Sequence, residues 1–248
     1  MFISMRRLCG LLCVAALVSA GSASAVLNGA FDGAGHPYVG LVSDGSTSCS
    51  GFLVGPTTFV TAGHCFADGA AVRGTQDASP TVPTWTGVSH LDPSYCCGIG
   101  NPQTHDVAVV VLDRAQPGPY AQLPALGAAA RLGKKASLTL VGYGVSGFSN
   151  GGGKPQPFAT FQRSYATLTL GNAGTDVSAE FFKLASTASG NKPGACFGDS
   201  GGPDLLPGTN VAVGLTSYGS NSICSGPSYA YRLDTPAAQS FVAQFLAR

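Results

Sequence analysis

The chain has 248 residues, of which 44% are apolar and only 10% are charged, and its formal net charge is +1. This length and apolar content are sufficient for one large domain or for two small lobes that share a core. The near-neutral charge excludes a strong electrostatic attraction to nucleic acid or to an anionic membrane surface, so we expect neither as a partner.

Residues 1–25 have the features of a signal peptide. Arg6 and Arg7 give a positive start, residues 8–18 are apolar, and Ala23-Ser24-Ala25 fits the small-residue rule for signal peptidase. The apolar part is too short to span a bilayer. We therefore expect residues 1–25 to be removed and residues 26–248 to be secreted as an extracellular protein. The short leader and the alanine-rich composition favour a bacterial origin.

Short apolar runs separated by turn residues predict an all-β chain, with 35 glycines and 16 prolines spread along it. The first expected strands are residues 38–42, 51–54, 58–62 and 107–112. Residues 115–133, which contain three prolines, are expected to link these to a second set at residues 136–141, 161–170, 181–183, 211–217 and 228–233. Two sets of about six short strands predict two small barrels with a cleft between them, the first over about residues 26–120 and the second over about 121–248.

The end of the chain has a different pattern. Thr235 is a suitable N-cap and Pro236 suits the first helical position, while residues 241, 242, 245 and 246 are apolar at helical spacing. We expect a short amphipathic helix here that packs on the second lobe.

Three separate segments point to one chemistry. In Gly198-Asp199-Ser200-Gly201-Gly202-Pro203 a serine stands between glycines, which keep its hydroxyl accessible and let a carbonyl group approach the backbone. A serine hydroxyl is a weak nucleophile unless a base activates it and an acid orients that base. The segment Val60-Thr61-Ala62-Gly63-His64-Cys65 offers the base, and His105-Asp106-Val107 offers the acid. At these residues the chain closely resembles the chymotrypsin/trypsin family of serine endopeptidases.

The resemblance implies two six-stranded antiparallel β-barrels with a short C-terminal α-helix. It makes Ser200 the nucleophile, His64 the base and Asp106 the residue that orients His64, with Ser217 supporting Asp106. It implies protein or peptide substrates, protein inhibitors as further partners, and a monomer. No metal or organic cofactor is implied, and no Cys/His cluster has the spacing of a zinc site.

Other interpretations of the motif were weighed. Gly198-x-Ser200-x-Gly202 also fits the nucleophile elbow of α/β-hydrolases, but that fold needs a histidine after the serine and none follows Ser200. A non-catalytic binding protein on the same scaffold, or a secreted esterase with the same triad, remains open. Asp106 could be a turn residue, while His36, His90 and His105 are interpreted as structural or surface residues.

The resemblance also assigns the residues around the nucleophile. The backbone amides of Gly198 and Ser200 would form the oxyanion hole. Asp199 would pair with the amine of a processed N-terminus, and Val26-Leu27-Asn28-Gly29, exposed by signal cleavage, resembles that terminus. The hypothesis is that signal peptidase itself produces the activating amine at Val26.

The predicted substrate pocket is uncharged. Gly194 lies six residues before Ser200, where trypsin-like members have an aspartate, so a preference for arginine or lysine lacks its usual counter-ion. Phe197, Ser217, Tyr218 and Gly219 are the other predicted substrate-binding residues. We expect a preference for apolar or aromatic side chains.

Six cysteines remain after residues 1–25 are removed. The resemblance pairs Cys49 with Cys65 and Cys196 with Cys224. Cys96 and Cys97 are adjacent and left over. They could form a vicinal disulfide, remain two free thiols, or link to another chain, and the sequence leaves these alternatives open.

Overall fold

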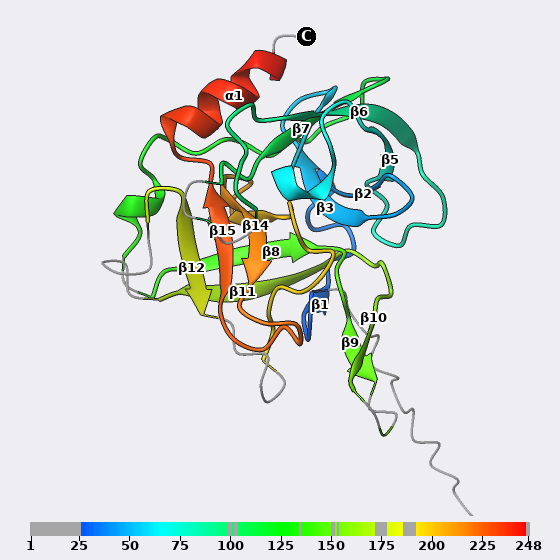
Figure 1. Ribbon diagram of the computed structural model, residues 1–248, viewed down its shortest axis with the longest axis vertical. Helices are drawn as coiled ribbons and strands as arrows, with labels where there is room; N and C mark the ends of the chain where they lie inside the picture. The colour runs from blue at the N-terminus through cyan, green and yellow to red at the C-terminus, as the bar shows by residue number, and fades with distance from the viewer. Residues whose placement is uncertain are drawn as a thin grey trace, which may run out of the picture.

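The computed structural model describes residues 26–246, apart from residues 99–100, 102–103, 134, 150–151, 153, 172–177 and 186–191. The predicted signal peptide therefore lies outside the described residues. The described part is mostly β, with two strand systems and a helix at the C-terminal end (Figure 1). The all-β class and the chymotrypsin-like arrangement predicted from the sequence are confirmed.

The first strand system is a closed antiparallel barrel. Its strands are β2 (Val39–Ser43), β3 (Ser48–Leu53), β4 (Thr58–Thr61), β5 (Ala71–Thr75), β6 (Trp85–Leu91) and β7 (Ala108–Leu112), paired in the order β2-β3-β4-β7-β6-β5. Large side chains such as Phe52, Phe59 and Trp85 fill its interior. Gly74 faces Trp85 across the β5–β6 pair, and a side chain at that position would clash with the indole ring. Glycine there makes room for the largest side chain of the core.

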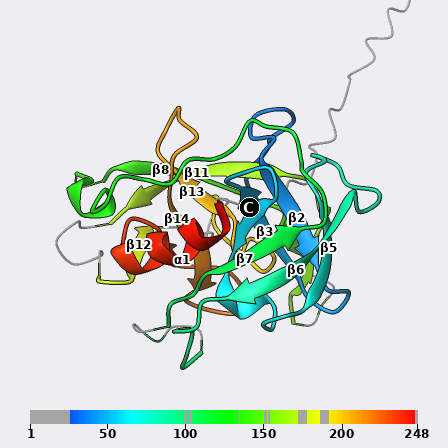
Figure 2. The same cartoon turned by 90° about the horizontal axis from the view of Figure 1, so that it is seen from above.

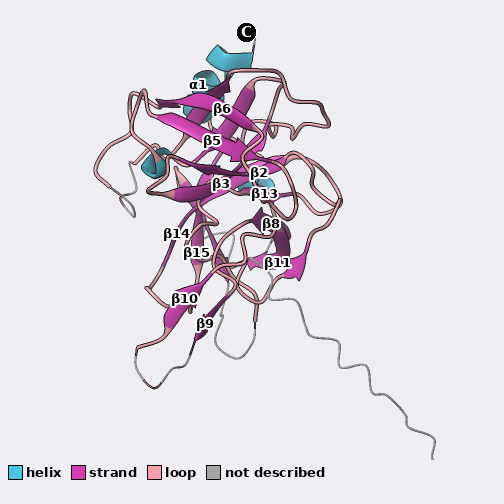
Figure 3. Cartoon of the chain, turned by 90° about the vertical axis from the view of Figure 1, so that its right-hand side faces the viewer, coloured by secondary structure: helices cyan, strands magenta, loops and turns pink. Residues whose placement is uncertain are grey.

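The second strand system comprises seven strands: β1 (Ala30–Phe31), β8 (Ser137–Gly142), β11 (Ser164–Leu170), β12 (Phe181–Ala185), β13 (Pro203–Leu205), β14 (Ala212–Gly219) and β15 (Ser228–Arg232). Because β8 pairs with both β13 and β11, six of these strands are paired in a ring, and β1 is added to β11. A separate hairpin, β9 (Gly147–Ser149) and β10 (Gln156–Phe158), extends away from the body of the molecule (Figure 3).

The C-terminal helix α1 (Pro236–Leu246) packs on the first barrel, so the prediction that it packs on the second lobe is wrong. It contacts β4 and β7, and the Thr58 hydroxyl donates to the Phe245 carbonyl at 2.8 Å. The ring of His90 from β6 lies 5.2 Å from that of Phe245. Viewed from above, the C-terminal end of α1 lies beside β7 of the first barrel (Figure 2). The predicted N-cap is present, because Thr235 Oγ1 accepts from the Ala238 amide at 3.2 Å.

A buried ion-pair cluster joins the two strand systems. Arg163, which precedes β11, donates from Nε to Asp32 Oδ2 at 2.7 Å. Its other nitrogens donate to backbone carbonyls of the first barrel and the N-terminal segment, those of Gln76 and Gly33, at 2.6 Å each. The His36 ring nitrogen Nδ1 lies 2.5 Å from Asp32 Oδ1. Arg163 therefore joins elements that are far apart in the sequence, and His36 adds a local contact to the same carboxylate.

Candidate active site

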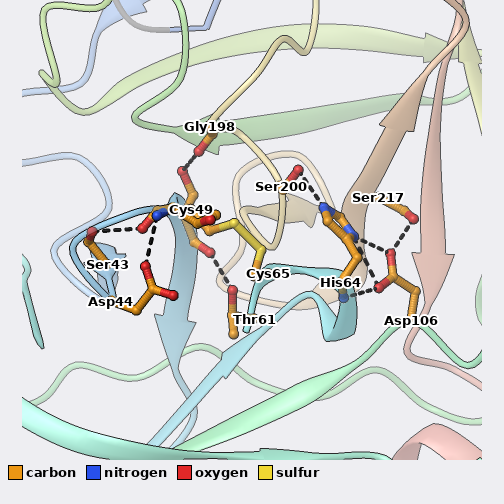
Figure 4. The surroundings of a disulfide bond; sticks show 12 residues. Ser43, Asp44, Cys49, Thr61, His64, Cys65, Asp106, Gly198, Ser200 and Ser217 are labelled. Carbon is orange, nitrogen blue, oxygen red and sulfur yellow. Dashed lines mark hydrogen bonds and ion pairs between the residues drawn. A yellow bond between two sulfur atoms is a disulfide. The ribbon is translucent and has the colours of Figure 1, made fainter. Parts of the chain in front are cut away.

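His64 lies on the short 3-10 helix η1 (Gly63–Cys65), directly after strand β4. Its backbone amide donates to Asp106 Oδ1 at 2.8 Å, and its ring Nδ1 lies 2.9 Å from Asp106 Oδ2. Gly63 is closely surrounded by Tyr95, Leu91 and the Val107 amide, so that a side chain there would make tight contacts with all three. The carboxylate of Asp106 therefore fixes both the backbone and the ring of His64 (Figure 4).

Asp106 is presented by a tight turn just before strand β7. His105 has φ of 49° and its carbonyl accepts from the Val107 amide at 2.8 Å, so the chain turns here before it enters the strand. Asp106 is fully buried, and the Ser217 hydroxyl donates to its Oδ2. Burial raises the pKa of Asp106, but the hydrogen bonds and charge of His64, together with the Ser217 bond, outweigh burial and lower it overall. Asp106 is therefore ionised near neutral pH.

Ser200 is held with its hydroxyl 2.9 Å from His64 Nε2. Gly201 follows with φ of 82°, and a side chain there would clash with Thr61 and the Ser50 carbonyl. The Ser200 carbonyl accepts from the Ser50 amide at 2.9 Å, so strand β3 of the first barrel holds the serine loop of the second. Three side chains from distant segments thus meet in one continuous hydrogen-bonded row (Figure 4).

Two backbone amides beside Ser200 are available to a ligand. Gly198 has φ of 92°, and its carbonyl accepts from the Ser50 hydroxyl at 2.8 Å, which fixes the orientation of this loop. Among hydrogen bonds between the described residues, none uses the amide of Gly198 or that of Ser200. Glycine is suited to this left-handed backbone conformation because it lacks a Cβ atom.

Asp199 lies behind the same loop and is fully buried. Its Oδ1 accepts from the Gly144 amide and its Oδ2 from the Cys196 amide, each at 2.9 Å. Burial raises the pKa of Asp199 to about 7, although both amide bonds act in the opposite direction. In the part of the chain that the structure describes, no cation pairs with this carboxyl group.

Val26, the predicted new N-terminus, is buried in the second strand system. It packs in the same apolar cluster as Leu140 and Ala195, and the next residue, Leu27, bridges to Gly194. The segment that begins at Val26 is therefore seated inside the protein, close in the fold to the residues that precede Ser200.

Disulfides fasten both sides of the site. Cys49 pairs with Cys65 beside His64, and Cys196 pairs with Cys224 beside the serine loop, as the resemblance implied. Cys96 and Cys97 are joined to each other, which is one of the three alternatives that the sequence left open. The described side chains hold one grouping with metal-ligand distances, Cys49, His64 and Cys65, but its cysteines are oxidised to each other and so cannot act as thiolate ligands.

A pocket of about 510 Å³ opens beside Ser200. The predicted residues Phe197, Ser217, Tyr218 and Gly219 line it, whereas Gly194 is buried, forms a bridge to Leu27 and does not line the pocket. Sequence reasoning missed Ala195 and Thr216 as lining residues, although each adjoins a residue that it identified. The lining contains His64 but no aspartate, glutamate, lysine or arginine among the described residues.

The trypsin family model matches residues 29–241, which is most of the chain. This chain is a member of the trypsin family. It is a serine endopeptidase that acts on protein or peptide substrates. No match to the sequence was found among curated proteins.

Solved structures agree with this trypsin-family fold. A structure of HL collagenase matches with a TM-score of 0.71 and 19% identity, covering 90% of this chain and 99% of the other. A structure of neuropsin, a serine protease expressed in the limbic system of mouse brain, matches with a TM-score of 0.63 and 21% identity, covering 85% and 94%. Within the described range, this trypsin-family chain has no helix with the length and apolar character needed to cross a membrane.

Proposed function

We propose that this chain is a secreted serine endopeptidase that cleaves peptide bonds with the triad Ser200, His64 and Asp106. Ser200 Oγ attacks the peptide carbonyl carbon while His64 Nε2 takes the hydroxyl proton. His64 then gives that proton to the leaving amine as the C–N bond breaks, which leaves an acyl-enzyme ester. Water, deprotonated by His64, hydrolyses the ester and restores Ser200.

The observation that carries this proposal is the row of contacts through His64. One ring nitrogen lies 2.9 Å from Ser200 Oγ and the other 2.9 Å from Asp106 Oδ2. Ionised Asp106 favours the tautomer with hydrogen on Nδ1, which leaves Nε2 free to accept the serine proton. The available amides of Gly198 and Ser200 would bind the oxyanion of the tetrahedral intermediate.

Three further assignments belong to this proposal. Residues 1–25 act as the signal peptide, and the three disulfides suit the oxidising environment that secretion leads to. Cleavage before Val26 releases an amine that pairs with Asp199, which otherwise lacks a cation, and so fixes the loop of the oxyanion hole. The pocket, lined without ionised carboxylate or amine groups, accepts apolar or aromatic side chains at the position before the cut.

Cleavage of a denatured protein, with the products mapped by mass spectrometry, tests the function. Ser200→Ala should lower turnover by on the order of 10⁶, the size of the effect in another serine protease. Ser94→Ala, which changes an exposed serine outside the site, is the matched control and should retain full activity. Full activity of Ser200→Ala would refute the assignment, and cleavage of esters alone would favour an esterase.

A further inference from the structure

Three polar side chains lie on the inner face of the second strand ring, beneath the pocket. They are Asp204 on β13, Thr216 on β14 and Ser228 on β15. Directly opposed residues of paired strands share a face, and so do residues two apart on one strand. Thr216 opposes Ala230, which is two residues from Ser228, and Asp204 opposes Gly214, which is two residues from Thr216. All three polar side chains therefore point to the same side.

That side is the interior of the ring. Ala230 belongs to the buried apolar cluster of the second strand system, as do Leu140, which opposes Asp204, and Leu184, which opposes Ser228. Asp204, Thr216 and Ser228 are themselves buried. A polar group is thus built into each of three neighbouring strands where apolar side chains would otherwise fill the core.

One of these positions, Thr216, lines the substrate pocket. The Thr216 hydroxyl donates to Asp204 Oδ2 at 3.5 Å. Gly219 also lines the pocket, and a side chain built there would meet nothing within 4 Å. Ser228 opposes Gly219 and so lies on the same face, where it is buried and does not itself line the pocket. The end of the pocket that faces the ring interior is therefore polar.

The polar groups at this end are not satisfied within the protein. Ser228 Oγ and Asp204 Oδ1 are buried without a hydrogen-bond partner among the described residues. Buried polar atoms of folded proteins are nearly always hydrogen-bonded, because leaving them unpaired is costly. The neighbouring Thr216 hydroxyl lines the pocket, so it is the polar group of this set that an incoming side chain can reach.

The charge of Asp204 decides which polar end fits. Burial raises the pKa of Asp204 to about 8, the Thr216 bond lowers it and nearby Asp199 raises it further, so Asp204 is neutral at pH 7. Asp204 does not itself line the pocket. A lysine or arginine head would therefore lose its water without meeting a negative charge, which is unfavourable. A neutral hydroxyl has no such penalty.

We propose that Asp204 is a positioning residue for substrate selection. By accepting the Thr216 hydroxyl hydrogen, it orients the Thr216 oxygen as a hydrogen-bond acceptor that faces the pocket. The pocket then prefers tyrosine over phenylalanine at the position before the cut. The tyrosine side chain is apolar along its length and ends in a hydroxyl that can donate a hydrogen bond. These properties match the uncharged lining of the pocket and the Thr216 oxygen at its inner end. A hydroxyl that donates one bond retains lone pairs for another. The inference rests on the proposed function and names its substrate class.

A matched peptide series that differs only in tyrosine, phenylalanine, leucine, lysine or glutamate before the cut tests the proposal. The wild-type kcat/KM for tyrosine should exceed that for phenylalanine about tenfold, the size of one neutral hydrogen bond. Thr216→Val and Asp204→Leu should bring the ratio close to one. Asp204→Asn should keep most of it, because its amide oxygen can accept the same hydrogen. Ser89→Ala, which removes a buried unpartnered hydroxyl from the first barrel, should leave the ratio unchanged.

The proposal is overturned if the wild type does not prefer tyrosine, if lysine is cleaved best, or if the ratio survives both Thr216→Val and Asp204→Leu. Equal loss in Asp204→Asn and Asp204→Leu would mean a purely structural role and would also overturn it. Its failure is distinct from failure of the proposed function. In the former case the enzyme still cleaves with Ser200 but ranks the peptides differently, whereas in the latter no peptide is cleaved.

Discussion

Asp32 and Asp204 are both buried aspartates, but their surroundings differ. Asp32, at the junction of the two strand systems, is held by Arg163 and by the backbone and ring of His36. Burial raises its pKa, but the bonds from His36 and Arg163 outweigh burial and lower it overall. Asp204, inside the second ring, accepts from the Thr216 hydroxyl, the one hydrogen-bond partner of its carboxyl group among the described residues, and its pKa is raised to about 8.

The difference separates two uses of a buried acid. A carboxylate whose two oxygens are both hydrogen-bonded within the protein, like that of Asp32, holds distant segments together and has no oxygen available to bind a ligand. A carboxyl group that is left partly unpaired, like Asp204 or Asp199, costs stability in the free protein. Such groups lie next to the pocket and the serine loop, where a substrate or a new N-terminus would approach. Both of these buried acids with raised pKa values therefore lie at the functional side of the molecule.

The largest effect should come from breaking the paired cluster. Asp32→Asn leaves the Arg163 guanidinium buried without its carboxylate, and we expect a loss of about 3–5 kcal/mol in the free energy of unfolding. Asp77→Asn, at a neighbouring exposed aspartate, is the control. Chemical denaturation in the Ser200→Ala background avoids self-digestion. A loss below about 1 kcal/mol, on the scale of an exposed pair, would mean that the cluster does not hold the junction.

Asp199 and Asp204 should make the stability depend on pH in the opposite direction from Asp32. Their folded pKa values of about 7 and about 8 lie above the usual 3.8, so the folded chain binds more protons between these limits. Stability of the uncleaved chain should therefore fall as pH rises from about 5 to 8, by on the order of 1 kcal/mol per pH unit. Asp32 has a lowered pKa, so its contribution is constant in this range and is lost only at acidic pH.

Denaturation of the uncleaved Ser200→Ala chain across this pH range measures the slope. Asp204→Asn in the same background should make it shallower, because that side chain no longer has to ionise inside the ring. An unchanged slope would contradict the assignment of a neutral Asp204 at pH 7.

Release of Val26 should satisfy one of these unpaired acids. Pairing with Asp199 raises the pKa of the new amine above its ordinary value of about 8. The stabilisation from this ion pair is complete below the pKa that the amine has in the unfolded chain. It is lost as pH rises through the pKa of the amine in the folded chain. Activity should therefore fall at alkaline pH, by on the order of 10² if the oxyanion loop is released. N-terminal sequencing of the active enzyme checks the terminus, and a start anywhere other than Val26 would exclude this account.

The smallest effect should come from Thr235, which belongs neither to the Asp32 ion-pair cluster nor to the surroundings of Asp199 and Asp204. Thr235→Ala removes the N-cap bond of helix α1 and should lower the free energy of unfolding by about 1 kcal/mol. The ratio of tyrosine to phenylalanine cleavage should not change, because the helix packs on the first barrel. A change in that ratio would show that the pocket responds to general loss of stability, and it would weaken the specific role of Asp204.

Sequence reasoning was most successful where short motifs are informative by themselves. The segments around His64, Asp106 and Ser200 were identified from local pattern and family resemblance. The all-β class was predicted from the short apolar runs between turn residues, and the resemblance implied the same fold. Strands with a continuous apolar run, such as β4 and β7, were located to within a residue or two. Strands β5 and β6 were missed because each contains a glycine and alternates with polar residues.

Other features depend on contacts that no local pattern encodes. The packing of α1 on the first barrel depends on the path of the chain after β15, and the Arg163 cluster joins segments more than 100 residues apart. Asp204 could not be assigned to the pocket floor from the sequence, since its position follows from the register of β13 against β14. These are properties of strand pairing and tertiary packing.

The central claim is that Ser200, His64 and Asp106 act as one proton-transfer unit. Reaction of the native Ser200→Ala, His64→Ala and wild-type proteins with a serine-directed sulfonyl fluoride, followed by peptide mass mapping, tests it most directly. We expect a single adduct on Ser200 in the wild type and none in His64→Ala, whose serine lacks its base. An adduct on another serine, or equally rapid labelling of Ser200 without His64, would contradict it.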